Sequence, residues 1–299
     1  MKKLTYILLL PCLWFTACVV PFDPGDIDQE RKFHIQCELT PGEMPLAYIH
    51  VTGTIDRSEP ISRPKEDINV FLDDSKRFPY SPSLEAYFIS SFTIEEGKEY
   101  TISIIDTNAI YDAPTAFART VVPFSNDIES IDVVENIENQ AGNEIQRVLE
   151  VDIEIENPTD GSNYFQITPS ILNPSLLIEG TEEYMPLESK FIEILSDESA
   201  FVKYIHKNGI FLDINKLESP LVTLRLTYTA QIDQYDLIDH MLFNLSTITD
   251  ETMMFHDQSD REVSLSSLQL DEPLTSSTNV ENGLGLFGSS AKSEFKLEF

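Results

Sequence analysis

The sequence predicts a mainly β protein, in which an N-terminal immunoglobulin-like β-sandwich is followed by a second antiparallel β domain with one or two helices. Two observations lead to this fold class. Apolar residues alternate with polar ones in many short runs, and the apolar positions are rich in β-branched and aromatic side chains. Clusters of Pro, Gly, Asn and Asp separate the runs, as turns separate strands. A hydrophobic content of 41% is enough to build a real core.

The first sandwich is expected over residues 31–124. About six or seven strands fit into these roughly 90 residues, which is the strand spacing of an immunoglobulin-like sandwich. Cys37 shares the parity of the apolar residues around it, so we expect a buried and unreactive thiol there. The aromatic residues Phe78, Tyr80, Tyr87 and Phe88 lie in or beside loops, where they either bind a ligand or cap the core. The clearest alternating runs lie at residues 33–39, 49–55 and 100–104.

The second domain is expected over residues 125–299, after a break in the strand pattern around Pro123. Apolar residues at helical spacing predict an amphipathic helix near 231–248 that lies on a sheet. Tyr184 is another exposed aromatic residue, with the same two interpretations as those of the first domain. Acidic residues alternate along 150–156, but their spacing of about 7 Å on a strand favours separate solvation. The clearest strand signals are the alternating runs at 149–156, 222–229 and 294–299.

Residues 1–17 have the pattern of a secretory leader. Two lysines precede an apolar run of about 12 residues, which is shorter than the ~20 residues of a membrane-spanning helix. Phe15-Thr16-Ala17-Cys18 then resembles a bacterial lipobox, although Phe15 stands where leucine is commoner. We expect cleavage before Cys18 and acylation of this cysteine, for example with palmitate, which would hold the protein on a lipid bilayer. The alternative is an ordinary leader with a chance cysteine after it.

The acidic stretch at residues 18–30 is expected to be a solvated tether between this anchor and the first sandwich. The whole chain carries a formal net charge of −31, and loss of the two leader lysines would make it −33 (−31 minus 2). Such a charge repels nucleic acid phosphates, so nucleic-acid binding is not expected. Divalent cations remain compatible with the charge, although no spacing of the 5 histidines predicts a metal site or a cofactor.

The sequence contains no pattern that nominates a catalytic residue, and the protein is not expected to be an enzyme. Ser-x-x-Lys occurs at Ser62–Lys65 and again at Ser289–Lys292, without the companion motifs of penicillin-binding proteins. His34 falls on the strand face opposite Cys37, which disfavours a Cys–His pair. A hydrolase that uses clustered acids or Ser289 is kept as the least favoured alternative.

The most specific stretch is DEPLTSSTNVENGLGLFG at residues 271–288. Its glycines allow positive φ or a close approach of two backbones, which points to a structural role at least as much as to a ligand site. The stretch resembles the C-terminal signature of a Bacteroidota lipoprotein family catalogued as domain of unknown function 4249. Segments at 97–102 and 116–131 are similar to that family as well. The residues that match the signature are Asn279, Asn282, Gly283, Gly285, Phe287 and Gly288.

The resemblance implies a lipid-anchored protein of the outer membrane, exposed on the cell surface or on the periplasmic face. It implies a non-enzymatic accessory or ligand-capture partner of a TonB-dependent transporter, with a ligand that the sequence does not identify. A stand-alone surface adhesin or binding module is the alternative. The family supplies no catalytic residues that could be carried over to this chain.

Overall fold

The computed structural model describes residues 31–52, 64, 67–142, 144–156, 164–172, 184–188, 191–195, 201–206, 209–216, 221–231, 240–254, 256 and 278–298. The predicted leader, Cys18 and the acidic tether therefore lie outside the described residues. The described part is mainly β, with several antiparallel pairings, one short α-helix at 250–254 and the 3-10 helix η6 (Ile214–Lys216), which confirms the predicted fold class. No helix in this part of the chain has the length and apolar character needed to cross a membrane.

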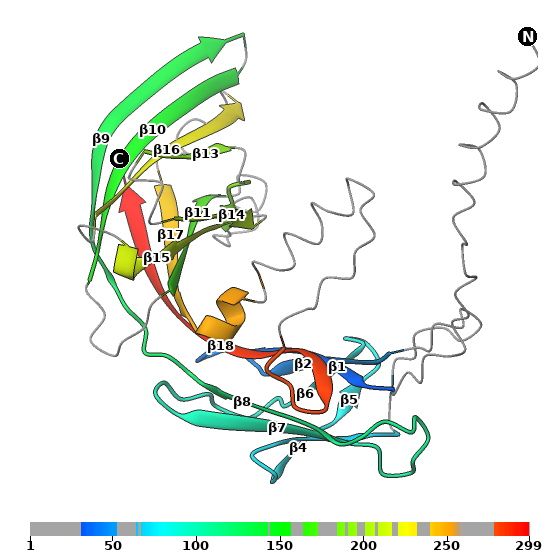
Figure 1. Ribbon diagram of the computed structural model, residues 1–299. Helices are drawn as coiled ribbons and strands as arrows, with labels where there is room; N and C mark the ends of the chain where they lie inside the picture. Colours follow the sequence, from blue (N-terminus) through cyan, green and yellow to red (C-terminus); the bar gives the residue numbers. More distant parts are fainter. Residues whose placement is uncertain are drawn as a thin grey trace, which may run out of the picture.

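The first sandwich is built from two sheets that lie at the lower end of the molecule (Figure 1). One sheet contains β1 (Phe33–Leu39), β2 (Leu46–Val51), β5 (Tyr80–Ser81), β6 (Ala86–Phe88) and the first half of β18 (Gly283–Glu298). The other contains β3 (Asn69–Leu72), β4 (Lys76–Phe78), β7 (Glu99–Ile105) and β8 (Ala116–Val121).

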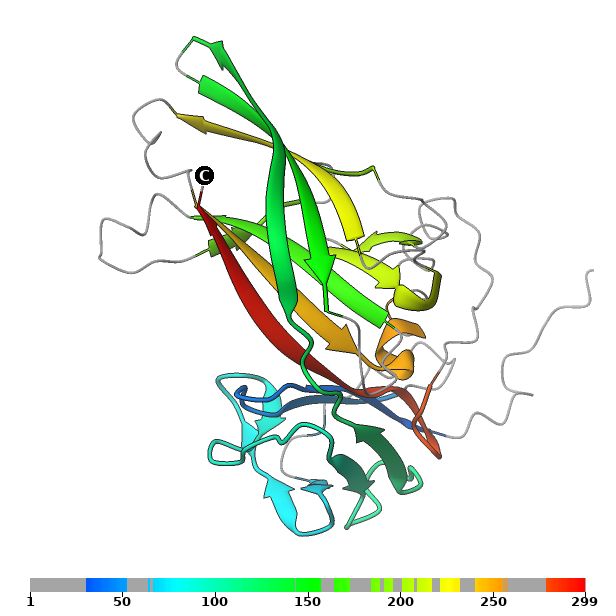
Figure 2. The ribbon, with the colours of Figure 1, turned by 90° about the vertical axis from the view of Figure 1, so that its left-hand side faces the viewer.

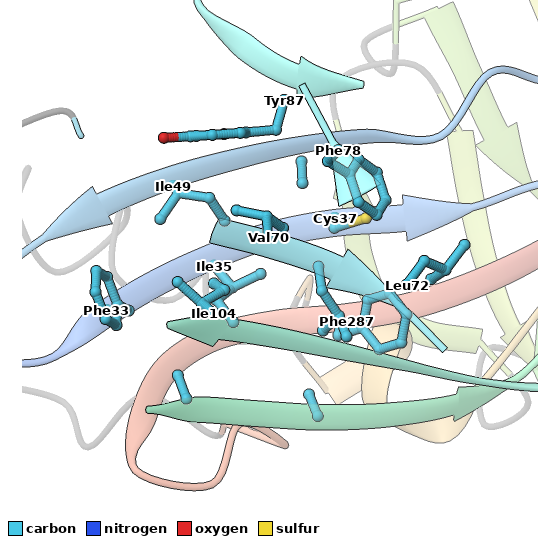
Figure 3. Packing of buried hydrophobic residues seen from close by; sticks show 14 of the residues in the cluster. Phe33, Ile35, Cys37, Ile49, Val70, Leu72, Phe78, Tyr87, Ile104 and Phe287 are labelled. Atoms are coloured by element: carbon cyan, nitrogen blue, oxygen red, sulfur yellow. The ribbon is translucent and has the colours of Figure 1, made fainter. Parts of the chain in front are cut away.

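The core of this sandwich follows from the period-two pattern of its strands. Along β1, Phe33, Ile35 and Cys37 are buried while the residues between them are not, as alternation predicts. These side chains meet Val70 and other apolar residues of the facing sheet, as Figure 3 shows. Burial raises the pKa of the Cys37 thiol, which agrees with the predicted inert cysteine. Phe287, from the far C-terminal strand, completes the same core.

The second sandwich also consists of two sheets around one core. Its first sheet contains β9 (Ile128–Ala141), β10 (Glu144–Ile155), β13 (Ile192–Ile194) and β16 (Leu221–Gln231). Its second contains β11 (Tyr164–Leu172), β12 (Tyr184–Pro186), β14 (Phe201–His206), β15 (Gly209–Asp213), β17 (His240–Ile248) and the second half of β18. The predicted alternating runs of β10 and β16 bury Leu149, Val151, Leu224 and Leu226 between the sheets.

The strand β18 belongs to both sandwiches. Residues 283–289 pair in parallel with β1, and residues 290–298 pair antiparallel with β17. A single ten-stranded sheet therefore continues from one sandwich into the other, and Figure 2 shows β18 making this passage. The division in space does not follow the predicted boundary at residue 124, because the glycine-rich segment near the C-terminus completes the first sandwich.

The predicted helix near 231–248 is wrong over residues 240–248, which form the strand β17. Residues 232–239 lie outside the described residues. The apolar residues of this segment fit the periods of both a helix and a strand. Met241, Leu242 and Leu245 would lie on one side of a helix, whereas Met241, Phe243 and Leu245 lie on one face of a strand. The fold selects the strand because β11 and β18 supply hydrogen-bond partners on both sides. Leu242 consequently faces away from the core that contains Met241.

The two sandwiches meet at a buried seam of hydroxyl groups. Ser290 Oγ lies 3.0 Å from Thr40 Oγ1, and Asn126 Nδ2 donates to Thr247 Oγ1 at 2.9 Å. Ser293 Oγ also donates to the Asn126 carbonyl oxygen at 2.6 Å. These groups form hydrogen bonds with each other where β18 passes from one sandwich to the other. Their burial therefore costs little free energy.

Candidate functional site

The asparagine of the C-terminal signature takes the place of a strand neighbour. Asn279 Nδ2 donates to the Phe287 carbonyl oxygen at 2.7 Å, and the Phe287 N–H donates to Asn279 Oδ1 at 3.0 Å. Both backbone groups of Phe287 are thus satisfied by one side-chain amide. Asn282 has a φ of 55° in the turn before β18, and its Nδ2 donates to the Thr115 carbonyl oxygen at 3.4 Å.

The glycines of the signature allow β18 to approach its neighbours closely. Gly285 has a φ of +95°, and a Cβ there would lie 2.0 Å from the carbonyl oxygen of Ile35 in β1. A Cβ on Gly283 would lie 2.9 Å from the Phe33 carbonyl oxygen, and one on Gly288 would lie 2.2 Å from Thr252 Oγ1. The space next to these residues is therefore filled by the protein itself, and the geometry of the signature is that of a strand joint.

Ser289 lies in the hydroxyl seam and has the environment of a structural serine. Its side chain is fully buried, it donates to the Val121 carbonyl oxygen at 2.9 Å, and Thr120 Oγ1 lies 3.0 Å away. Lys292, the other member of its Ser-x-x-Lys pattern, forms an ion pair with Glu43 at 2.6 Å. A nucleophilic serine needs a base and access to substrate, and Ser289 is placed against backbone instead. Ser62 and Lys65 lie outside the described residues.

The acidic side chains of β10 form a charged sheet face that Arg225 crosses. The guanidinium lies 3.0 Å from a Glu150 oxygen and 3.1 Å from a Glu193 oxygen, and the hydrogen bond to Glu150 is the main cause of its raised pKa. Thr223 Oγ1 donates to Asp152 at 2.6 Å. In the described part of the chain, no three His, Cys, Asp or Glu residues are arranged to hold a metal ion.

The predicted exposed aromatic residues have different surroundings. Phe78 and Tyr87 are buried in the first sandwich, where they belong to the core (Figure 3). Tyr80 packs edge-on against Tyr87, with the ring centroids 5.3 Å apart. Tyr184 belongs to the second sandwich and lines a cavity. Of the aromatic residues that the sequence singles out, Tyr184 is therefore the one that leads to a candidate site.

This cavity has a volume of about 620 Å³, within the range typical of small-molecule sites. It lies on the outer face of the second sandwich, because the residues that alternate with its lining, such as Met241 and Phe243, point into the core. Four neighbouring strands, β12, β11, β17 and β18, supply its floor and rim. The lining residues are Ser170, Tyr184, Pro186, Leu242, Asn244, Glu294 and Lys296.

The strand register places these residues in rows. Pro186 is opposite Ser170, Ser170 is opposite Leu242, and Leu242 is opposite Lys296, so one row of side chains crosses all four strands. In the next row, Asn244 is opposite Glu294. On the other side of the first row, Tyr184 is opposite Leu172, and His240 is opposite Glu298.

The polar groups of the cavity include one that has no hydrogen-bond partner among the described residues. The Tyr184 hydroxyl oxygen is buried and makes no hydrogen bond in the described structure. Ser170, which is 2% exposed, and Asn244 add a hydroxyl and an amide to the lining. Buried polar groups are usually satisfied, so an unpartnered group beside a cavity indicates a place for a ligand or for water.

The sequence identified Tyr184 as a binding candidate but missed the rest of this site. Asn244 lay within the expected helix. Glu294 and Lys296 belonged to the polar, solvent-facing positions of an alternating run, and nothing in the sequence distinguished them as binding residues. Period two alone predicts that Glu294 and Lys296 share a face, but their position beside Asn244 depends on the pairing of β17 with β18.

Comparison with known proteins agrees with the resemblance of the C-terminal signature. A family model described as "Domain of unknown function (DUF4249)" matches residues 19–296, which is nearly the whole chain. Among curated proteins, no match is found. The match includes both sandwiches and the strand that joins them, and the chain belongs to the DUF4249 family.

Proposed function

We propose that this protein is a lipid-anchored, non-enzymatic protein of the outer membrane that captures a small ligand for a TonB-dependent transporter. The observation that carries the proposal is the open cavity on the second sandwich, which is lined by polar side chains and lies beside the Tyr184 hydroxyl, a group without a hydrogen-bond partner among the described residues. Capture requires a cavity with complementary groups and no reacting residue. The function as a transporter accessory follows from the resemblance to Bacteroidota lipoproteins.

The proposed anchor and the proposed binding site are connected to different sandwiches. Acylated Cys18 would hold the chain through the tether at 18–30, and the first described strand after this tether is β1 of the first sandwich. The cavity lies on the second sandwich. The first sandwich would then act as a spacer between the bilayer and the binding site, with β18 as the strand that pairs in both sandwiches.

The anchor is tested by labelling cells with an alkyne-bearing fatty acid. Wild type and Cys37→Ala should be labelled, since Cys37 is buried in the core, whereas Cys18→Ala should not. Equal labelling of Cys18→Ala and wild type would contradict the lipid anchor.

The partnership is tested by affinity purification of the full chain from outer membranes solubilised in mild detergent, followed by mass spectrometry. Repeated recovery of one TonB-dependent receptor with wild type, and its loss with Cys18→Ala, is the expected result. Recovery of the protein without any such receptor, under conditions that retain other membrane complexes, would contradict the transporter role. It would favour the alternative of a stand-alone binding module, which needs only the cavity.

A further inference from the structure

The cavity on the second sandwich combines an apolar floor with a polar rim. Leu242 and Pro186 supply aliphatic surface, and the half-buried Tyr184 adds an aromatic ring. Glu294 and Lys296 are exposed at the edge formed by β18. A ligand that fits this arrangement has one face of C–H groups and a polar edge, because each surface is stabilised by its own kind.

The hydrogen-bonding groups of the cavity are mixed in character. The hydroxyls of Tyr184 and Ser170 can each donate and accept, and the Asn244 amide offers both functions at separate atoms. Glu294 accepts only, whereas Lys296 donates only. A ligand that pairs with all of them needs several groups that both donate and accept. Hydroxyl groups have this property, whereas a phosphate only accepts and an ammonium only donates.

The charges of the lining also favour a neutral ligand. Glu294 and Lys296 are two positions apart on one face of β18, and so about 7 Å apart along the strand. Their formal charges cancel, so the lining offers no net attraction to an ion of either sign. The net charge of −31 adds a general repulsion of anions.

We propose that this cavity binds a neutral saccharide unit, with one ring face on Leu242 and Tyr184 and its hydroxyls bonded to Asn244, Glu294 and Lys296. This inference rests on the proposed function of ligand capture and names the ligand class of that site. A pyranose has an apolar C–H face and a rim of hydroxyls that each donate and accept. The ligand could also satisfy the buried Tyr184 hydroxyl, which has no partner among the described residues.

The test compares sugars that share one ring and differ in charge. Saturation-transfer NMR and calorimetry are run on the full chain in a zwitterionic detergent, because detergents with sugar head groups would compete. The neutral probes are glucose, galactose, N-acetylglucosamine, maltose and cellobiose, and the charged probes are glucuronate and glucosamine. We expect at least one neutral probe to bind, and glucuronate to bind at least about tenfold more weakly than glucose or its best neutral relative.

Three variants locate the binding. Tyr184→Phe removes only the hydroxyl and should weaken binding about two- to tenfold, the range for one hydrogen bond. Its thermal midpoint should not fall below the wild-type value, because that hydroxyl has no hydrogen bond to lose in the described part of the structure. Asn244→Leu should weaken binding at least about tenfold by removing a donor and an acceptor. The matched control Tyr48→Phe changes an exposed tyrosine of the first sandwich and should bind as wild type does.

The outcomes separate this inference from the proposed function. Binding of a neutral sugar that weakens in Tyr184→Phe and Asn244→Leu, but not in Tyr48→Phe, supports the saccharide site. Failure of every neutral sugar to bind, or sugar binding that both cavity variants leave unchanged, overturns it. If no sugar binds but a transporter is recovered by affinity purification, the proposed function is retained with another class of ligand. If a sugar binds but no transporter is recovered, only the transporter role is contradicted.

Discussion

Substitution of Gly285 by alanine should be among the most damaging single changes in this protein. Gly285 has a φ of +95°, and its Cβ would lie 2.0 Å from the carbonyl oxygen of Ile35, while the nitrogen and carbonyl carbon of Ile35 lie 3.0 Å away. All three atoms belong to the backbone of β1, so no side chain can rotate to make room. Gly42 is the matched control, since its φ is +79° and nothing lies within 4 Å of the position that a Cβ would take there.

The cost of the two substitutions can be worked from these contacts. Both alanines adopt a left-handed conformation, which costs about 1–2 kcal/mol. At Gly285, restoring a contact of 3.0 Å requires a displacement of about 1 Å (3.0 minus 2.0) between β18 and β1. Such a displacement breaks about two ladder hydrogen bonds, at roughly 1–2 kcal/mol each. We therefore expect a loss of about 3–6 kcal/mol for Gly285→Ala and about 1–2 kcal/mol for Gly42→Ala.

Urea unfolding followed by circular dichroism measures the difference between the two variants. A loss of several kcal/mol is a large part of the stability of a typical domain, so Gly285→Ala should unfold at much lower urea than Gly42→Ala, or fail to accumulate as folded protein. Unfolding free energies of the two variants within about 1 kcal/mol of each other would refute the reasoning, because the close approach of β18 to β1 would then carry no cost.

Three further predictions concern other contacts of the fold. Asn279→Asp cannot donate to the Phe287 carbonyl oxygen, and urea unfolding should show a loss of about 1–3 kcal/mol; unchanged stability would contradict the role of that amide. Burial raises the pKa of Cys37, so the unfolded chain loses its thiol proton first as the pH rises. The contribution of Cys37 to the free energy of unfolding is therefore fully present below about pH 8.5, and above this pH it falls by up to about 1.4 kcal/mol per pH unit. Urea titrations between about pH 7 and 10 should show this fall in wild type but not in Cys37→Ala. Arg225→Gln leaves Glu150 without its ion pair, so the urea midpoint should fall at low salt and recover toward wild type near 1 M salt; a difference that salt does not change would exclude this electrostatic cause.

The strands that the sequence predicted best are those with one face in a core and one in water. Over residues 149–155 of β10 and 222–229 of β16, apolar residues alternate with polar ones, and both strands form with the expected faces. In β1 the same pattern also gave the buried position of Cys37. Alternation is a strong signal there because a shift of one residue would place every apolar side chain in water.

The secondary structure predicted from the sequence was wrong where an apolar run lacked such alternation. Over 240–248, the outer face carries Leu242 as well as Asn244, so that the polar side of the strand is not consistently polar. A half-apolar outer face is what a cavity floor requires, and it is the feature that made a helical stripe fit the same residues. The error in the predicted secondary structure and the missed site thus have one cause.

Local chemistry determined the regularly alternating strands, the inert thiol and the need for glycine in the C-terminal signature, since these depend on side-chain period, on burial and on allowed φ. Tertiary structure decided which strands are neighbours. The parallel pairing of β18 with β1 joins residues about 250 positions apart, and the pairing of β17 with β18 places Asn244 beside Glu294. No local pattern encodes such partners, because every strand offers the same backbone N–H and C=O groups to its neighbours. The pairing of β18 with β1 is selected instead by the shared core and by the close approach of the two backbones at Gly285.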